Sequence, residues 1–523
     1  MKKIISVIIF SILYNQALVT EPSDYEIIQN EITSLKSEVI FDELYIKPYI
    51  EKKPGNYKAV NIIKSLDLKN ILMIEPIMGL RLNKSQVELP KYWITPGLKF
   101  KSSIPLINMP TSIWMYSWAS FYKHSGVYDN NFGPVSYLTL IIDPIQLGDL
   151  FLLTPDYSTS FFTRSVEPEG GLDFDQSQAG ISILSNKFEF VFGKFNTSFG
   201  PSTRSNLSLS HNAPPMEQVL LKFKHDKFIF SYVLAALGSN IPTNDITEDS
   251  LYVNQWDLFD IPNHGNMLEG DRAPVYERYV AHHRLDFKIN DRFRFGLYEQ
   301  VIFGARNIPM SYMLPILPFW SSQHESGDLD NLMIGVDFDL FLSKKKNITN
   351  RLYGSLMIDE WAPYSTFDKN NRNWFAWQLG FSRNGKILGK DIMIKAEYAR
   401  IDGRAYTHRF IINEPKHYGY NLGYWSGSHS DDLLFNLFMM LETNRYIKIG
   451  YEFTRFSNND FDESIYYLEG QYDNNICYLS TITGNGSSDA CYEDEFLASG
   501  YDYRGKISIL FSTSLKYHLF FDC

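Results

Sequence analysis

The sequence has few cysteines, no cluster of positive charges and no long apolar run in its body. Three cysteines among 523 residues exclude a scaffold built on disulfides. The 49 basic and 60 acidic residues give a net charge of −11, and no block of five Lys or Arg occurs, so nucleic acid is a poor candidate partner. Past the N-terminus no apolar stretch reaches the ~18 residues of a transmembrane helix.

These absences leave a membrane β-barrel open, because its lipid-facing and lumen-facing residues alternate and their hydropathies average out. The mean hydropathy of −0.22 fits that case. Aromatic residues make up 15% of the chain and hydrophobic residues 44%, so the chain is not intrinsically disordered.

The first residues resemble a secretory signal peptide. Lys2 and Lys3 precede the apolar run 4–13, and Ala17 offers a small residue for cleavage. The run is too short for a membrane anchor. We therefore predict a signal peptide over residues 1–17 and export of the mature chain.

The first mature segment has the period of a helix. Ser23 and Glu26 form the pattern of a capping box. Apolar residues then recur on one helical face, at Ile28, Ile32, Leu35 and Val39. A second, shorter helix is expected over 59–66. Residues 18–69 are predicted to form a small periplasmic helical segment.

From about residue 71 the period changes to two, which indicates half-buried strands. Large apolar side chains alternate with polar or small ones in 334–340, 374–382 and 446–455. The chain ends on a similar alternation in 515–521. A secreted β-sandwich would alternate in the same way.

The connections distinguish the barrel from the sandwich. Short turns at 225–226, 290–291, 344–347 and 443–444 alternate with long connections at 239–278, 304–330, 401–431 and 456–504. Short turns at one end and long loops at the other are typical of outer-membrane barrels. The fold class is therefore all-β, a transmembrane antiparallel β-barrel of about 18 strands over residues 70–523.

Carboxylates are the first candidates for chemistry. Asp359 and Glu360 are adjacent, and Glu299, Glu397 and Glu452 are expected to face the lumen. Two carboxylates hydrolyse a glycoside only when held ~5–9 Å apart, and strand alternation sends neighbours to opposite faces. We expect these acids to pair with Arg and Lys in the lumen. We expect no enzyme and no cofactor.

The same alternation argues against a metal pair at His282 and His283. His324-Glu325 lacks the second histidine of a zinc-protease helix. We expect no bound metal.

Aromatic residues gather in the predicted long loops. Aromatic faces against sugar C–H groups, with Arg for acidic groups, are a means of holding a polysaccharide. Loop packing that plugs the barrel mouth, or an interfacial girdle, would use the same residues. The candidate glycan-binding residues are Tyr420, Tyr424, Trp425, Trp256, Trp320 and Arg404.

Cys477 and Cys491 lie in the longest predicted external loop and are expected to form a disulfide after export. Cys523 follows the last predicted strand and should remain free.

A set of short motifs between residues 190 and 360 resembles the Wzi-type capsule assembly family. The set includes Gly193-Lys194, Phe199-Gly200-Pro201, the run Leu207 to Pro215 with Asn212, Pro214 and Pro215, His283-Arg284, Glu299, Tyr312, Pro315, Pro318-Phe319, Gln323-His324, Asp330-Asn331, Gly335, Asp337 and Asp359. The resemblance implies an outer-membrane barrel with a small periplasmic helical element. It also implies a lectin-like, non-enzymatic role in holding capsular polysaccharide at the surface.

Together these features predict a monomeric protein of the cell outer membrane that binds or anchors surface polysaccharide and takes part in capsule assembly. A diffusion channel for small solutes or oligosaccharides is the alternative, and a secreted glycoside hydrolase is a third. Plugging loops would favour the first, and conductance the second.

Overall fold

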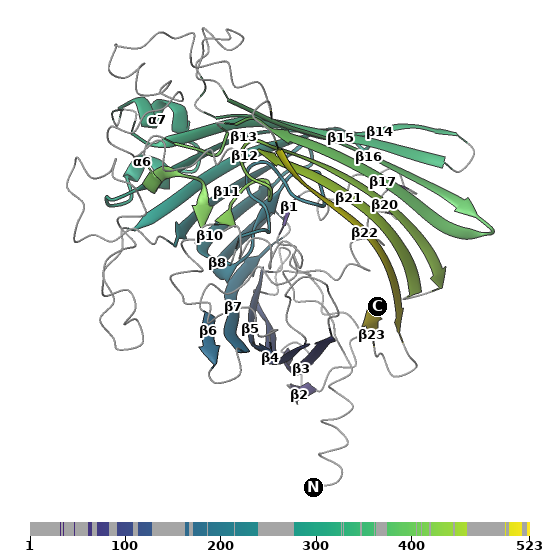
Figure 1. The fold of residues 1–523 in the computed structure, drawn as a ribbon. Coiled ribbons are helices and arrows are strands. Elements are labelled where there is room, and N and C mark those ends of the chain that lie inside the picture. The colour runs from purple at the N-terminus through teal and green to yellow at the C-terminus, as the bar shows by residue number, and fades with distance from the viewer. Residues whose placement is uncertain are drawn as a thin grey trace.

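The computed structural model describes the greater part of the chain from residue 71 onward and short segments before it (Figure 1). The described residues are 32, 35, 46–47, 61–64, 71–82, 92–107, 113–127, 163–166, 171–185, 187–213, 215–238, 277–325, 327, 329–345, 348–359, 361, 374–403, 405–408, 411–417, 420–442, 445–457, 497, 501–514 and 520–522. The predicted signal peptide and Cys477, Cys491 and Cys523 lie outside them.

Long antiparallel strands dominate the fold. They are β3 (Ile71–Leu82), β4 (Tyr92–Ile107), β5 (Ile113–Val127), β7 (Gly171–Leu184), β8 (Phe188–Phe195), β10 (Met216–Lys224), β11 (Phe228–Leu237), β12 (Arg278–Asn290), β13 (Phe293–Gly304), β14 (Asn331–Lys345), β15 (Ile348–Asp359), β16 (Trp374–Ile387), β17 (Lys390–Ile401), β20 (Ser430–Glu442), β21 (Arg445–Ser457) and β22 (Tyr501–Ser514).

Shorter elements lie between and beside the long strands. They are β1 (Ile46–Lys47), β2 (Asn61–Lys64), β6 (Thr163–Val166), β9 (Ser198–Phe199), β18 (Lys416–His417), β19 (Tyr420–Asn421), β23 (Phe520–Asp522), the helices α6 (Met310–Met313) and α7 (Phe319–Glu325), and the 3-10 turn η6 (Ile411–Asn413). No helix of the described part of the chain is both long and apolar enough to cross a membrane.

The sheet is a meander in which each long strand pairs with the next, and it curves into a barrel (Figure 1). The meander skips only short elements among the described strands: β5 pairs with β7 past β6, β8 with β10 past β9, and β17 with β20 past β18 and β19. The predicted hairpins at 225–226, 290–291 and 443–444 are confirmed by the registers of β10–β11, β12–β13 and β20–β21. The strand number of about 18 stays a prediction, because much of 128–170 lies outside the described residues.

The strand faces separate as the alternation predicts. In β16, Phe375, Trp377, Leu379 and Phe381 are the half-buried or exposed set, whereas Trp374, Ala376, Gln378, Gly380 and Ser382 are buried. The buried set includes polar side chains and the accessible set is apolar. A polar interior and an apolar exterior are the arrangement that a barrel needs in lipid, where every backbone group must be satisfied by the closed sheet. The fold class predicted from sequence is confirmed.

The segment before the barrel agrees with the sequence only in part. Ile32 and Leu35 are helical and buried against Phe341 and Met393, near the short-turn end of the strands. The second helix expected over 59–66 is wrong, since β2 pairs with β3 there. The β-branched Ile62 and Ile63 suit a strand, and pairing with β3 supplies the backbone partners that a short helix would need from itself.

The chain end also differs from the predicted strand over 515–521. The structure extends β22 to Ser514 and adds β23, which turns back to pair with β22 through Thr513 and Phe521. Of the predicted strand only Phe520 and Phe521 are described, and they belong to β23. Residues 515–519 themselves lie outside the described part of the chain.

Candidate functional site

Two connections at the long-loop end fold into the barrel and contact its inner wall. They are residues 196–215, between β8 and β10, and the described residues of 402–429, between β17 and β20. We call them together the lumen plug. Its side chains bond to lumen-facing residues of distant strands, among them Gln378 of β16 and Glu397 of β17. The lumen plug therefore spans the interior rather than standing above it.

The first connection holds its shape by a sharp bend at Gly200-Pro201. Gly200 has a φ of 134°, and a Cβ built on it would lie 2.4 Å from Oδ1 of Asn206. The Asn206 side chain accepts a hydrogen bond from Ser202 N at 3.1 Å and donates one to Ser198 Oγ at 2.9 Å. Glycine is required there by both the backbone angle and the space.

Glu397 anchors the tip of this connection to the wall. Its carboxylate accepts hydrogen bonds from Ser202 Oγ at 2.8 Å, from Thr203 N at 3.2 Å and from Arg204 N at 3.2 Å. On the wall side, Tyr353 OH donates to the same carboxylate at 2.6 Å. A carboxylate that is only 5% exposed is stabilised when its oxygens receive this many donors.

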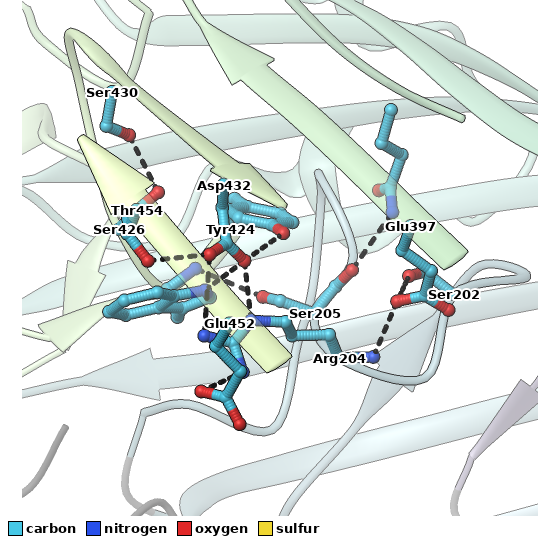
Figure 2. Close-up of polar contacts among 12 residues, drawn as sticks. Ser202, Arg204, Ser205, Glu397, Tyr424, Ser426, Ser430, Asp432, Glu452 and Thr454 are labelled. Atoms are coloured by element: carbon cyan, nitrogen blue, oxygen red, sulfur yellow. Dashed lines mark hydrogen bonds and ion pairs between the residues drawn. The ribbon is translucent and has the colours of Figure 1, made fainter. Parts of the chain in front are cut away.

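Asp432 of β20 forms the second anchor (Figure 2). Arg204 makes an ion pair with Asp432 through Nε and a second one with Glu452 of β21 at 3.0 Å. Asp432 also accepts hydrogen bonds from Tyr424 OH at 2.8 Å and Trp425 Nε1 at 3.0 Å. One buried carboxylate thus joins both connections of the lumen plug to the wall.

The Arg204 guanidinium also lies over the Trp425 ring, 4.7 Å from its centroid. Arg204 belongs to the first connection and Trp425 to the second. A cation stacked on an aromatic face and paired with carboxylates satisfies a charge that burial alone would penalise. This contact, like Asp432, couples the two connections.

Direct bonds between the two connections complete the lumen plug. Tyr406 OH donates to Leu207 O at 2.6 Å and accepts from Tyr424 N at 3.0 Å. Ser210 N donates to Leu422 O at 2.7 Å, and Asn212 Nδ2 donates to Gly423 O. The motif residue Asn212 therefore tethers one connection to the other.

The inner wall around the lumen plug carries paired charges. Arg284 bonds to Asp286 at 2.6 Å and to Asp337 at 2.9 Å, and all three side chains are at most 3% exposed. Arg351 pairs with Asp339 at 2.6 Å and donates to Pro201 O at 3.2 Å. The predicted pairing with Arg and Lys in the lumen is confirmed for Glu452, which pairs with Arg204 at 3.0 Å and with Lys506 at 3.7 Å. Glu397 also faces the lumen, but its hydrogen bonds come from hydroxyl and backbone N–H groups.

The predicted histidine separation is also confirmed. His282 faces the lumen, where Nε2 lies 3.3 Å from Ser208 Oγ, and His283 lies on the outer face. The expectation that Glu299 faces the lumen is wrong. Glu299 points outward and pairs with His283 at 3.0 Å, because Tyr298 and Gln300 occupy the inward positions of β13.

The predicted aromatic site divides into buried and accessible parts. Tyr424 is 1% exposed and packs in the core cluster, so its ring cannot lie against a sugar. Tyr420 and Trp425 are half-buried and pack against the same cluster. Tyr424 thus fits the packing alternative that the sequence left open. Trp320 is 37% exposed on α7, whereas Trp256 and Arg404 lie outside the described residues.

The remaining motif residues have structural positions. Pro201 and Pro215 are buried in the first connection, and Pro214 lies outside the described residues. Asp359 is buried at the end of β15 and accepts a hydrogen bond from Tyr406 N at 2.8 Å. Pro201 O accepts a hydrogen bond from Arg351, so both Pro201 and Asp359 join the lumen plug to the wall.

The hairpin β18–β19, which belongs to the lumen plug, contacts the end of β11 through His417. Gly238 N donates to His417 Nδ1 at 2.7 Å. Burial, together with the nearby positive charge of Arg278, lowers the pKa of His417 from 6.5 to about 3. His417 is therefore neutral at physiological pH and acts as an acceptor.

Sequence reasoning missed Arg204 and Asp432. Asp432 occupies an inward position in an alternating strand, next to the outward Leu433. When a charged residue stands at an inward position and its strand neighbours are large, apolar and outward, the charge lies in the lumen. Such a pattern predicts that the charge has a buried partner. The identity of the partner, 228 residues away, carries no such signal.

An antiparallel barrel with an apolar outer face and a charged interior is a protein of the bacterial outer membrane. Large apolar side chains are exposed on the outward face of several strands, including Phe192 at 57%, Leu379 at 47% and Ile509 at 68%. In water such a surface would be unfavourable. The protein is therefore an outer-membrane β-barrel.

No family model matches the chain, and no curated protein matches it. Among solved structures it is similar to Wzi of Escherichia coli, described as an outer membrane protein involved in group 1 capsule assembly and a carbohydrate-binding β-barrel. The identity is 12% and the TM-score 0.47, over 98% of this chain and 89% of that one.

Two Pseudomonas aeruginosa structures are also similar. OccD3 (OpdP) has 9% identity and a TM-score of 0.39 over 85% of this chain and 81% of that one. The outer membrane protein OprD has 8% identity and a TM-score of 0.35 over 78% and 79%. At these distances the barrel is identified from the strands and side chains of this chain itself.

Proposed function

We propose that the protein binds or anchors surface polysaccharide at the outer membrane and takes part in capsule assembly, without catalysis. The observation that carries the proposal is the lumen plug. A diffusion channel needs an open lumen, whereas here Glu397 and Asp432 tie both connections to the inner wall. The motif residues Gly200, Pro201 and Asn212, which resemble those of the Wzi-type family, lie within the lumen plug.

The accessible aromatic residues of the lumen plug are the proposed contact surface. Tyr420 and Trp425 keep part of their side chains accessible, and both are held from below by the core cluster. Rigid aromatic rings bind sugar C–H groups at little conformational cost. Tyr424, which bonds to Asp432 beneath them, would support the contact surface and not touch the glycan.

The proposal is non-catalytic because the buried wall acids that anchor the lumen plug already have partners. Glu397 accepts hydrogen bonds from five groups, and Asp432 accepts them from Arg204, Tyr424, Trp425 and Thr454. General acid–base catalysis needs a carboxyl group that can reach the reacting atom. These carboxylates instead stabilise the fold of the plug.

The alternative is a diffusion channel for small solutes or oligosaccharides. The charged inner wall is a feature that channels also have. A channel would show steady conductance in planar bilayers. A plugged binding barrel would show little, and removal of the plug contacts would raise it.

The test combines surface retention and conductance. A strain lacking the gene is complemented with the wild type, with the double variant Tyr420→Ala/Trp425→Ala, or with Trp377→Ala as a control on the outer face of β16. Aromatic contacts contribute about 0.5–1.5 kcal/mol each, so the double variant should retain capsule roughly tenfold less well. The control should match the wild type.

Faster migration of unboiled than boiled protein on a denaturing gel reports that each variant is a folded barrel. Full capsule retention by the folded double variant would contradict the assigned contact surface. Retained capsule in the deletion strain itself, together with high conductance of the pure wild type, would support the channel instead.

A further inference from the structure

The connection 305–330, between β13 and β14, folds over the outside of the barrel. Its helices α6 and α7 lie beside the long-loop ends of β12 and β13 in Figure 1. Tyr312 and Phe319 are fully buried in a cluster with the outward-facing Tyr232, Phe303 and Leu332. The Tyr312 and Phe303 ring centroids are 4.9 Å apart. This connection therefore covers the outer wall, opposite to the lumen plug.

His283 and Glu299 hold α7 on the wall. His283 Nδ1–H donates to Pro315 O at 2.9 Å, and the His283 ring stacks on Phe319 with centroids 4.1 Å apart. Glu299 Oε2 accepts a hydrogen bond from Phe319 N at 2.7 Å and lies 3.0 Å from His283 Nε2. Two outward-facing polar residues in an apolar wall are thus satisfied by the connection that covers them.

Tyr312 and Asp330 fix the rest of the connection. Tyr232 OH donates to Tyr312 O at 2.7 Å, and Tyr312 OH donates to Asp330 at 2.6 Å. Gln323 Nε2 donates to Asp330 O at 2.6 Å, and Arg306 pairs with the Asp330 carboxylate. We call these residues together the outer clasp, which comprises Tyr232, His283, Glu299, Arg306, Tyr312, Pro315, Phe319, Gln323 and Asp330. Most of its members belong to the motif set, which the proposed function does not explain.

Within residues 310–316 of the connection, the exposed side chains are all apolar. Met310 is 73% exposed, Met313 46%, Leu314 51% and Ile316 84%. We call these four residues the apolar ledge. The outer clasp holds the segment in place, so their exposure does not come from a loose loop. An exposed apolar cluster of this kind marks a surface that contacts something other than water.

The height of the outer clasp on the barrel indicates what that surface contacts. His283 is eight residues from the turn at Asp291. With a rise of ~3.3 Å per residue and a tilt of ~40°, it lies roughly 20 Å above the short-turn end, near the top of an apolar band ~25 Å tall. Below the clasp, the lipid-facing Leu297 and Val336 are 42% and 39% exposed. The apolar ledge continues this lipid-facing wall at the level of the outer leaflet.

We propose that the apolar ledge is a membrane contact, embedded among the lipids of the outer leaflet. The barrel wall beneath it is already lipid-facing, so the ledge widens the same interface. Trp320, 37% exposed on α7 in the same connection, is of the residue type that is enriched at membrane–water interfaces. The outer clasp is the device that keeps the segment at that depth.

The test measures whether lipid reaches the apolar ledge. An environment-sensitive fluorescent amino acid replaces Ile316 in the full chain, and in a control it replaces Leu388, which is 96% exposed in the short β16–β17 turn. Both proteins are folded into phosphatidylcholine–phosphatidylglycerol vesicles with and without nitroxide-labelled lipid. At 316 we expect blue-shifted emission that nitroxide lipid quenches strongly and aqueous iodide quenches little. At 388 we expect the reverse.

Two results would overturn the proposal. Equal quenching by iodide at 316 and 388, without an effect of nitroxide lipid, would place the ledge in water. Quenching by neither agent at 316 would mean that protein covers the ledge, and cross-linking would then identify a second copy of the chain. If the label at 316 prevents folding, the same label at Met310, which is 73% exposed, gives the same readout.

Discussion

The connections 196–215 and 305–330 leave the same end of the barrel and fold in opposite directions. The first enters the lumen, where Ser202, Thr203 and Arg204 meet the carboxylates of the wall. The second covers the outer face, where Tyr312 and Phe319 meet apolar side chains. The difference shows that each connection packs on the face of the wall whose side chains match its own. Charged groups on the inner face bind a polar connection, and apolar groups on the outer face pack against an aromatic one.

Polar contacts also occur on the outer face, and aromatic packing also occurs in the lumen. Outside, the carboxylate of Glu299 accepts a hydrogen bond from the backbone N–H of Phe319, and Asp330 pairs with Arg306. Inside, Tyr406 and Tyr424 contribute rings to the core but also bond through their hydroxyl groups. Substitutions that remove these contacts test the two regions separately. We expect the largest loss of stability where a buried charge loses its partner.

The largest effect is expected from Asp432→Ala. The change leaves Arg204 with Glu452 alone and removes the acceptor of Tyr424 OH, Trp425 Nε1 and Thr454 Oγ1. Breaking a buried ionic network in this way costs about 3–5 kcal/mol. The folded gel band should disappear at a lower temperature, and conductance in planar bilayers should rise.

Asp502→Ala, at an exposed position of β22, is the matched control and should leave both readings unchanged. An Asp432→Ala barrel with wild-type stability and no conductance would contradict the role of Asp432 as the main anchor of the lumen plug.

Gly200→Ala should have the next largest effect. The φ of 134° and the 2.4 Å approach to Asn206 Oδ1 both oppose a Cβ, and backbone strain of this kind costs about 1–3 kcal/mol. Gly385→Ala is the control, because nothing lies within 4 Å of its Cβ position. Hydrogen exchange of 196–213 should quicken in the first variant and not in the second. Equal exchange in both would show that the bend tolerates a side chain.

The sequence predicted the strands and their faces because the physical signal is local. Alternation in β14, β16 and β21 needs only neighbouring residues, and the short turns between strands are set by a few residues. The same rule could have corrected Glu299, which stands in the outward set between Leu297 and Val301. The charge of Glu299 suggested that it faces the lumen, but its position in the alternation places its side chain on the outer face.

The partners within the lumen plug could not be predicted in this way. Arg204 and Asp432 are 228 residues apart, and Ser202 and Glu397 are 195 apart. No period links such residues, and the register of the whole barrel decides which wall positions the plug meets. For the same reason composition could show that 420–425 is rich in aromatic residues, while it could not show that Tyr424 is buried.

Acid should loosen the lumen plug through His417. Its pKa is lowered to about 3 in the folded protein, against 6.5 when unfolded, so only the unfolded chain binds the proton between these values. Neutral His417 makes its full contribution to stability above pH 6.5. As the pH falls from 6.5 toward 3, the free energy of unfolding decreases by about 1.4 kcal/mol per pH unit. Gel-band melting temperatures across this range should fall less steeply for His417→Gln, whose amide oxygen can still accept from Gly238 N. Parallel curves for the two proteins would exclude His417 as the cause.

The smallest effect on the melting temperature of the barrel is expected on the outer face, from Tyr312→Phe. The change removes the hydroxyl that donates to Asp330 but keeps the ring that packs on Phe303 and Phe319. Asp330 keeps its ion pair with Arg306, so the loss is that of one hydrogen bond to a charged group, about 1.5–3 kcal/mol at most.

Lipid beside the apolar ledge should hold the segment in place, so the loss should be local. Hydrogen exchange of 305–325 should quicken while the melting temperature of the barrel stays the same, and Tyr451→Phe on the outer face of β21 should change neither. A lowered barrel melting temperature would show that the outer clasp stabilises the wall itself and does more than hold the covering connection.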